Sequence, residues 1–204
     1  MLSAKQIADR IKLCESADAG MLSIVPQPDL ASVLRFGAAS IDLRLGRWFR
    51  TLRPSRTHLL DISLGLSPDT SQQDAHLTKE YFVRFGEKFV LHPHNFVLGI
   101  TLEWVRLPAD LGGYIAGKSS LGRRGLIIET AAGLQPGFSG CLALELSNVG
   151  EVPIALLPGM RICQIFLHHI YESHRAKSQF FGRRKPVLGN VNADDVLRKL
   201  KHGN

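Results

Sequence analysis

The residues with the clearest chemical potential form one short segment, residues 117–125, with the sequence GKSSLGRRG. It combines two hydroxyls and three cations with three glycines. Glycines allow backbone N–H groups to approach a ligand closely, and Lys and Arg supply positive charge for phosphate. The segment is therefore a candidate phosphate-binding site, although the same composition also fits a polar hairpin turn.

The stretch from Gly112 to Ser119 also matches the P-loop spacing, GxxxxGK followed by Ser or Thr. That motif requires a loop followed by a helix. Here residues 114–116 favour a strand, and Gly122 and Gly125 disfavour a helix after it. We interpret the match as accidental.

Glu145 is the second candidate, because it lies in a stretch of alternating apolar residues, 141–148 (CLALELSN). The alternation predicts a strand whose three leucines face the core. Glu145 and its small neighbours Cys141, Ala143 and Ser147 then share the opposite face, which leaves space in front of the carboxylate. Such a carboxylate could serve as a general base. The alternative is an ordinary solvent-facing glutamate on an amphipathic strand.

The histidines and cysteines do not fit the common metal and thiol mechanisms. The signature of the zinc deaminases is missing, because no histidine precedes a glutamate by two positions and no CxxC occurs. The close pairs His92/His94 and His168/His169 have no further ligands at a recognised metal spacing. There is also no GxSxG motif for a serine nucleophile. The sequence therefore predicts neither zinc nor another metal held by protein ligands.

Many short strands with Gly and Pro between them predict a mostly β domain, a sandwich or a barrel. Ser3 and Gln6 form a capping-box pattern that predicts an N-terminal helix ending near Gly20. A short C-terminal helix is expected at 193–202, and the polar stretch 55–79 is expected to be a long surface excursion. The expected strands are 39–46, 81–91, 95–105, 113–115, 125–130, 141–148, 154–157 and 161–168.

Composition describes an ordinary globular chain of 204 residues, of which 45% are hydrophobic and 21% charged. No apolar run is long enough to span a membrane, and the N-terminus lacks the apolar core of a signal peptide. The three cysteines are dispersed, which fits a reducing compartment. We therefore expect a cytoplasmic protein without a membrane partner.

The net charge of +7 is unevenly distributed, because the residues from Tyr171 to the end contribute +5 of it. A general nucleic-acid binder would more often spread positive charge over a face of the folded body, so nucleic acid is not expected as a partner. The basic tail suits a small polyphosphate or has no specific ligand. We expect one β-rich nucleotide-binding domain at 1–170 and a basic tail at 171–204 that closes over the active site.

Together, the two candidate segments resemble the dCTP deaminase family, within the dUTP pyrophosphatase superfamily. Six ordered motifs between Leu2 and Gly189 carry the resemblance. They are LSAKQI at 2–7, SIDLRLG at 40–46, FVLG at 96–99, GKSSLGRRGL at 117–126, PGFSGCLALELSN at 136–148 and LPGMRI at 157–162.

The resemblance implies a distorted jelly roll or β-barrel of the dUTP pyrophosphatase type with short N-terminal and C-terminal helices. It also implies a homotrimer with active sites between subunits. In such enzymes a glutamate activates water for attack on cytosine C4 without zinc, and Glu145 matches this glutamate. Ser119 and Arg123 match residues of a neighbouring subunit that hold the water and the base. Mg²⁺ would arrive bound to the triphosphate of a deoxynucleoside substrate.

The resemblance assigns further residues of this chain to substrate binding. They are Lys118, Ser120, Leu121, Gly122, Thr130, Ala131, Gln135, Ala143, Leu144, Gln164, Tyr171, Gln179 and Arg183.

One departure from the family pattern concerns the sugar and the triphosphate. Gln135 stands where the family has an aspartate that contacts the deoxyribose and, in the pyrophosphatase branch, supports the attacking water. A glutamine can hydrogen-bond a hydroxyl but cannot act as an anionic base. Other positions favour the bifunctional branch: Ala132 and Gly133 replace a His-Arg pair of the deaminase-only branch, and Gln164 matches a glutamine of bifunctional members.

The other departure lies in the tail that closes over the phosphates in family members. Gln179 and Phe180 replace a lysine and a tyrosine of that segment. Three cations follow a few residues later, and we expect them to restore the lost charge: Arg183, Arg184 and Lys185.

The sequence thus predicts a dCTP deaminase-like hydrolase that converts dCTP, or a related cytosine nucleotide, to dUTP and ammonia. Two alternatives stay open. One is a dUTP pyrophosphatase or a bifunctional deaminase–pyrophosphatase that makes dUMP, which Gln164 favours and Gln135 disfavours. The other is a nucleotide-binding homologue without full catalytic activity, which Gln135 and the altered tail suggest.

Overall fold

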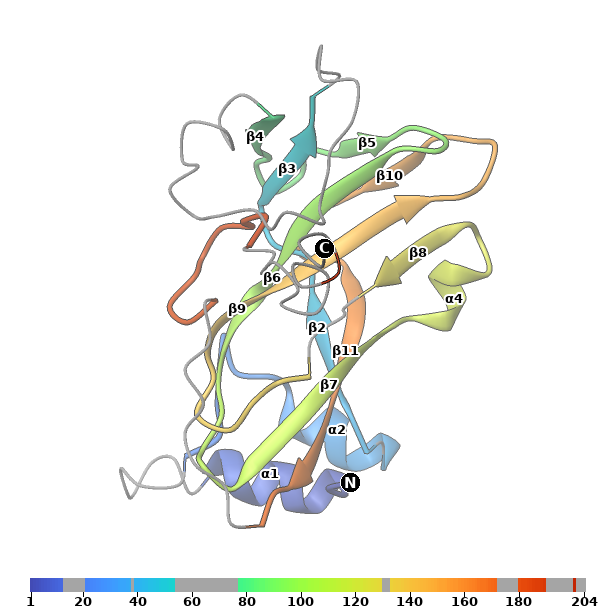
Figure 1. Ribbon diagram of the computed structural model, residues 1–204. Coiled ribbons are helices and arrows are strands. Elements are labelled where there is room, and N and C mark those ends of the chain that lie inside the picture. The colour runs from blue at the N-terminus through green and yellow to red at the C-terminus, as the bar shows by residue number, and fades with distance from the viewer. Residues whose placement is uncertain are drawn as a thin grey trace.

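The computed structural model describes residues 1–12, 21–37, 39–53, 77–129, 133–171, 180–189 and 200. Its strands form a large sheet, a small sheet and a two-stranded ribbon (Figure 1). In the large sheet β1 (Ser23–Val25) pairs with β6, and the others follow the order β4 (Thr78–Phe82), β3 (Trp48–Leu52), β6 (Phe96–Arg106), β9 (Ser139–Asn148), β8 (Leu126–Glu129). The small sheet has the order β2 (Ile41–Arg44), β11 (Arg161–His169), β7 (Leu111–Gly117). The ribbon pairs β5 (Phe89–Leu91) with β10 (Ile154–Leu156).

Three helices lie within the described ranges: α1 (Ala4–Lys12), α2 (Leu30–Phe36) and the single turn α4 (Ser119–Gly122). In Figure 1, α1 and α2 lie together below the ends of β7 and β11, whereas α4 lies at the opposite end of β7, beside β8. The predicted capping box opens α1: the Ser3 N–H donates to Gln6 Oε1 at 2.8 Å, and the Gln6 N–H donates to Ser3 Oγ at 3.3 Å.

One apolar core joins the two sheets. Leu144 and Leu146 of β9 belong to the same buried cluster as Ile165 and Leu167 of β11, and all four side chains are 0% exposed. Burying each such side chain contributes about 1.5–3 kcal/mol, so the inward face of β9 is strongly fixed. The alternation predicted for this strand is confirmed, because every second residue from Gly140 to Asn148 is buried.

The prediction of a mostly β fold is confirmed, but several of its details are wrong. Among the described residues the strands form separate sheets and no closed barrel. The single strand expected at 81–91 is two strands, β4 and β5, because the chain turns at Gly86, where φ is +86°. The helix that Gly122 and Gly125 were expected to prevent exists as the one-turn α4, which ends at Gly122.

Besides α4, three elements were not expected: β1, β3 and α2. The expected end of the first helix near Gly20, most of the excursion at 55–79 and nearly all of the helix at 193–202 lie outside the described residues. No helix in the described part of the chain is long and apolar enough to cross a membrane.

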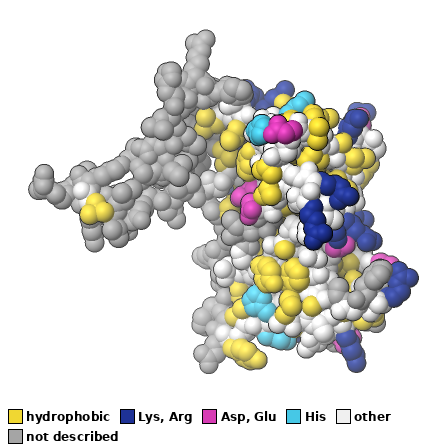
Figure 2. Space-filling view, turned by 90° about the vertical axis from the view of Figure 1, so that its right-hand side faces the viewer, with side chains coloured by type: hydrophobic (Ala, Val, Ile, Leu, Met, Phe, Trp, Pro, Cys, Tyr) yellow, Lys and Arg dark blue, Asp and Glu magenta, His cyan; other side chains and the backbone are white. Residues whose placement is uncertain are grey.

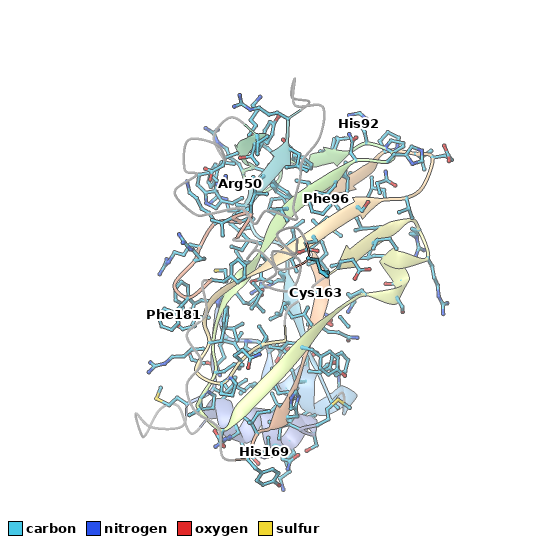
Figure 3. The ribbon with its side chains drawn as sticks, viewed as in Figure 1. Arg50, His92, Phe96, Cys163, His169 and Phe181 are labelled. Atoms are coloured by element: carbon cyan, nitrogen blue, oxygen red, sulfur yellow. The ribbon has the colours of Figure 1, made fainter. Side chains whose placement is uncertain are left out.

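Cys163 lies near the start of β11 and is fully buried (Figure 3). Burial raises the pKa of its thiol to about 12, and the nearby carboxylates of Glu103 and Asp42 act in the same direction, against a smaller lowering by Lys118. The thiol is therefore neutral in the folded protein at any physiological pH.

We expect Cys163 to make the folded state lose stability in alkaline solution. Above pH 9 the unfolded chain releases the thiol proton, whereas the folded chain keeps it until about pH 12, so the free energy of unfolding falls with pH in this range. In Cys163→Ala the decline between pH 9 and 11 should be shallower, by at most about 1.4 kcal/mol per pH unit. Urea unfolding measured across this range tests the prediction, and equal slopes would contradict it.

Candidate active site

A row of directly paired residues crosses the large sheet at the level of Glu145. From strand to strand it runs Glu80, Arg50, Leu98, Glu145 and Glu129. Residues directly opposite each other in a sheet point to the same face. Glu145 therefore shares its face with the ion pair between Arg50 and Glu80.

Glu145 is half-buried and lines a cavity of about 320 Å³. Most of the wall is apolar, and its residues come from β6, β7 and β9 and from the loop before β9. Arg183 and Lys185 of the tail also line it. A largely apolar hollow with a few polar groups is typical of sites for small organic ligands. The cavity is lined by Ile100, Ile115, Leu134, Phe138, Cys141, Leu142, Ala143, Glu145, Phe180, Arg183, Lys185 and Val187.

The segment 118–123 follows β7 and forms α4 at the surface. Lys118 precedes the helix, and its Nζ donates to Asp42 Oδ1 at 2.7 Å. Ser119, Ser120 and Arg123 are exposed. Figure 2, which looks onto the side where α4 lies in Figure 1, shows Lys and Arg side chains gathered on that face. The segment thus presents hydroxyls and cations outward, as an anion-binding surface would.

The glycines of this segment differ in what their surroundings require. A Cβ on Gly117 would lie 2.8 Å from the Cβ of Ile128, and Gly125 has a φ of +87°. A Cβ on Gly122 would meet nothing within 4 Å. Packing and backbone conformation thus account for Gly117 and Gly125, while Gly122 faces open space.

A second cavity, of about 520 Å³, lies between the small sheet and the region around α2. It is lined by Gln164, whose Oε1 accepts a hydrogen bond from Ser40 Oγ at 3.2 Å, and by Arg161, whose Nη1 lies 3.6 Å from Asp42 Oδ2. Because Asp42 also accepts from Lys118, this cavity is linked to the segment 118–123. It is more charged than the cavity at Glu145.

At one wall of the second cavity a carboxylate is buried. Glu103 is 3% exposed, and its two oxygens accept from the Arg44 backbone N–H at 2.8 Å and from Arg44 Nε at 2.6 Å. A buried carboxylate requires such partners, because an unpaired one would be strongly destabilising. The pair fixes one edge of the cavity.

The two cavities are separate within one chain. They have no lining residue in common, and residues 118–123 do not line the cavity that holds Glu145. The structure therefore does not bring Glu145 together with Ser119 and Arg123 inside one described chain. A site that uses all three requires a second copy of the chain.

The other predicted site residues lie in the cavity of Glu145, in the core, at the surface or outside the described residues. Ala143 and Arg183 line the cavity of Glu145. Leu144 is fully buried in the core, so only its backbone is available to a ligand. Gln135 is exposed, and Tyr171 is 89% exposed. Leu121 packs partly against the core, and Thr130, Ala131 and Gln179 lie outside the described residues.

Three residues of the second cavity were not among the predicted site residues: Asp42, Glu103 and Arg161. Two of them stand in motifs that were noted, SIDLRLG and LPGMRI, so a signal was present. No group of three or more His, Cys, Asp or Glu side chains that could hold a metal ion occurs in the described residues.

Comparison with known proteins assigns the family. The family model for dCTP deaminase-like proteins matches residues 1–170. The chain belongs to this family. A Nocardia farcinica protein named dCTP deaminase, dUMP-forming, is 44% identical over 190 residues, which cover 89% of this chain and 88% of that protein. A Corynebacterium diphtheriae protein of the same name is 44% identical over 180 residues, which cover 83% of this chain and 89% of that protein.

A solved structure supports the fold of this dCTP deaminase-like chain. The crystal structure of 2′-deoxycytidine 5′-triphosphate deaminase from Agrobacterium tumefaciens matches it with a TM-score of 0.52 and 24% identity. The match covers 72% of this chain and 43% of that chain. The expected distorted jelly roll is confirmed, and the relatives confirm the expected dCTP deaminase-like hydrolase.

The expected product is wrong. The sequence analysis favoured dUTP, whereas the curated relatives of this dCTP deaminase-like chain are named dUMP-forming. Gln135 was the residue that disfavoured the alternative in which the enzyme makes dUMP. The glutamine amide cannot act as an anionic base, but this difference at one position does not decide the product.

The glycines at the two ends of the segment 117–122 give a matched test of its packing. We expect Gly117→Ala to destabilise the fold by about 1–3 kcal/mol, because the new Cβ would overlap Ile128. Gly122→Ala should leave stability unchanged or raise it by up to about 1 kcal/mol, because a helical alanine there meets nothing. Thermal unfolding measures both changes, and equal effects of the two variants would contradict this description.

Proposed function

We propose that this enzyme converts dCTP to dUMP, with release of ammonia and pyrophosphate. The observation that carries the proposal is the position of Glu145, half-buried on β9 in a largely apolar cavity large enough for part of a nucleotide. The names of relatives that are 44% identical support the choice of substrate and product. Residues 1–170 would form the catalytic domain and 171–204 the tail.

Deamination begins with a water molecule next to Glu145. The carboxylate takes a proton from the water, and the resulting hydroxide attacks C4 of the cytosine. Glu145 then passes the proton to N3, which gives a tetrahedral intermediate. The proton of the new hydroxyl moves to the amino group, ammonia leaves, and the C4 carbonyl of uracil forms. One water is consumed, and Glu145 returns to its ionised state.

Ser119 and Arg123 would come from a neighbouring subunit and would hold the water and the base. Their exposure at the surface supports this role, because they are accessible to a second copy. Hydrogen-bond donors placed at the reacting carbon stabilise the charge that develops there. We therefore propose a homotrimer in which each site combines the β9 face of one subunit with the α4 surface of the next.

The triphosphate would lie along the cationic side of this interface. Lys118, Ser120 and the α4 backbone at Gly122 would contact it, with Gln164 from the second cavity and Arg183 from the tail. Mg²⁺ would enter with the substrate, bound to its phosphate oxygens. In the second step a second water attacks the α-phosphorus, the bond from this phosphorus to the bridging oxygen breaks, pyrophosphate leaves, and the proton of the attacking water passes to the solvent. Gln135 would orient a hydroxyl of the nucleotide without accepting a proton.

Replacing Glu145 tests the first step. In Glu145→Gln the amide cannot accept a proton from water, so ammonia release should fall by about 10²–10⁴-fold. The matched control is Glu129→Gln, because this exposed carboxylate lies directly opposite Glu145 on β8 and has no role in the proposed reaction. It should retain wild-type turnover within about threefold.

Ammonia and pyrophosphate are measured separately, with dCTP as substrate. The wild-type enzyme should release them in equal amounts. Ammonia without pyrophosphate would contradict dUMP formation, and undiminished turnover in Glu145→Gln would contradict the role of this carboxylate.

A mixture of two inactive variants tests whether the site lies between subunits. Glu145→Gln and Arg123→Ala each remove one half of the site. When they are unfolded and refolded together in equal amounts, about a quarter of the sites should combine two intact halves, so about a quarter of wild-type activity should return. Arg123→Ala mixed with itself is the control. A mixture as inactive as its components would indicate that each chain builds its own site.

A further inference from the structure

The tail segment 180–189 lies against the large sheet on the side of β9 and β6 (Figure 1). Its backbone pairs alongside the first residues of β9. The Gly182 N–H donates to the Ser139 carbonyl at 2.8 Å, and the Cys141 N–H donates to the Arg183 carbonyl at 2.9 Å. β8 pairs only with residues 145–148 of β9, so the tail occupies the part of that edge which β8 leaves open. These bonds fix the register of Arg183 beside the cavity of Glu145.

Beyond Arg183 the tail crosses the sheet and is held at each strand it reaches. The Arg184 guanidinium lies 4.9 Å from the ring centre of Trp104 on β6. Lys185 Nζ lies 3.8 Å from the ring centre of Trp48 on β3 and 3.2 Å from Glu80 Oε2 on β4. Cation–π contacts of this kind contribute about 0.5–2 kcal/mol each.

A further hydrogen bond holds the backbone of the tail. The Arg50 Nε donates to the Pro186 carbonyl at 2.9 Å, and the same guanidinium pairs with Glu80 and donates to Thr78 Oγ1 at 3.0 Å. Arg50 and Glu80 lie in the row that carries Glu145. The groups that hold the tail and the carboxylate of the cavity therefore share one face of one sheet.

The three tail cations make different contacts with the sheet. Arg184 and Lys185 contact Trp104 on β6, Trp48 on β3 and Glu80 on β4, and Lys185 also lines the cavity of Glu145. Arg183 stays beside β9 and lines the cavity of Glu145. That these three cations restore the charge lost from the tail stays a prediction.

We propose that Trp48, Trp104, Glu80 and Arg50 are positioning residues that dock the tail on the large sheet and so place Arg183 over the Glu145 cavity. The role of Arg183 in substrate binding rests on the proposed function. The docking itself does not, because it involves only residues of this chain.

The tryptophans provide a direct signal for docking. The chain contains two tryptophans, Trp48 and Trp104, and a tail cation lies over the ring of each. Loss of the tail from the sheet would expose both rings to water. Intrinsic fluorescence therefore reports the docked state in the unmodified protein.

The test uses the double variant Arg184→Ala/Lys185→Ala in the full chain. We expect its emission to shift to the red and acrylamide quenching to increase by about twofold, because water reaches both indoles. The KM for dCTP should rise by about tenfold while kcat stays within about twofold, because the variant removes Lys185 from the cavity wall and releases Arg183 from it, and neither cation takes part in proton transfer. Lys88→Ala, which removes an exposed cation from the turn before β5, is the matched control and should change neither property.

A conservative variant separates docking from general damage. Lys185→Arg, combined with native Arg184, keeps a cation over Trp48 and beside Glu80, so both emission and KM should remain near wild type. Unchanged emission in the double variant would overturn the docking. A red shift with unchanged KM would overturn the positioning role. If the wild-type enzyme released no ammonia from dCTP, the proposed function would fail, and the emission of the double variant would still decide whether the tail is docked.

Discussion

The pairing of β6 with β9 is the constraint on which the site depends. Their antiparallel register sets Leu98 opposite Glu145 and Val97 opposite Leu146. Because strand side chains alternate between faces, burial of the β9 leucines leaves Glu145 only the outer face. A shift of one residue would bury this carboxylate in the core. Burial of the β9 leucines thus determines which face of the sheet carries Glu145.

The candidate site residues lie on two surfaces of the fold that differ in polarity. One surface, the cavity wall around Glu145, is largely apolar, while the other carries hydroxyls and cations around α4. An apolar wall suits a neutral base, and a cationic surface suits phosphates. Because the two surfaces lie apart in one chain, Lys118 pairs with Asp42 and not with Glu145.

Elements whose pattern lies in neighbouring residues could be predicted from the sequence. β9, with its buried leucines, and α1, with its capping box, were predicted because neighbouring residues determine them. β3 was missed because only Phe49 of its five residues is buried, so no alternation is visible. α2 was missed although Asp29 and Gly37 cap its two ends, which a search for caps would have found. Contacts between distant segments, such as Lys118 with Asp42, have no local pattern.

The short length of β8 has one more consequence. It leaves residues 139–143 of β9 beside an edge where the tail donates and accepts backbone hydrogen bonds. Bare strand edges recruit strands from other molecules, which is a common route to aggregation. A chain shortened before Gly182 would lose this cover, so proteolytic trimming of the C-terminus would threaten solubility as well as catalysis.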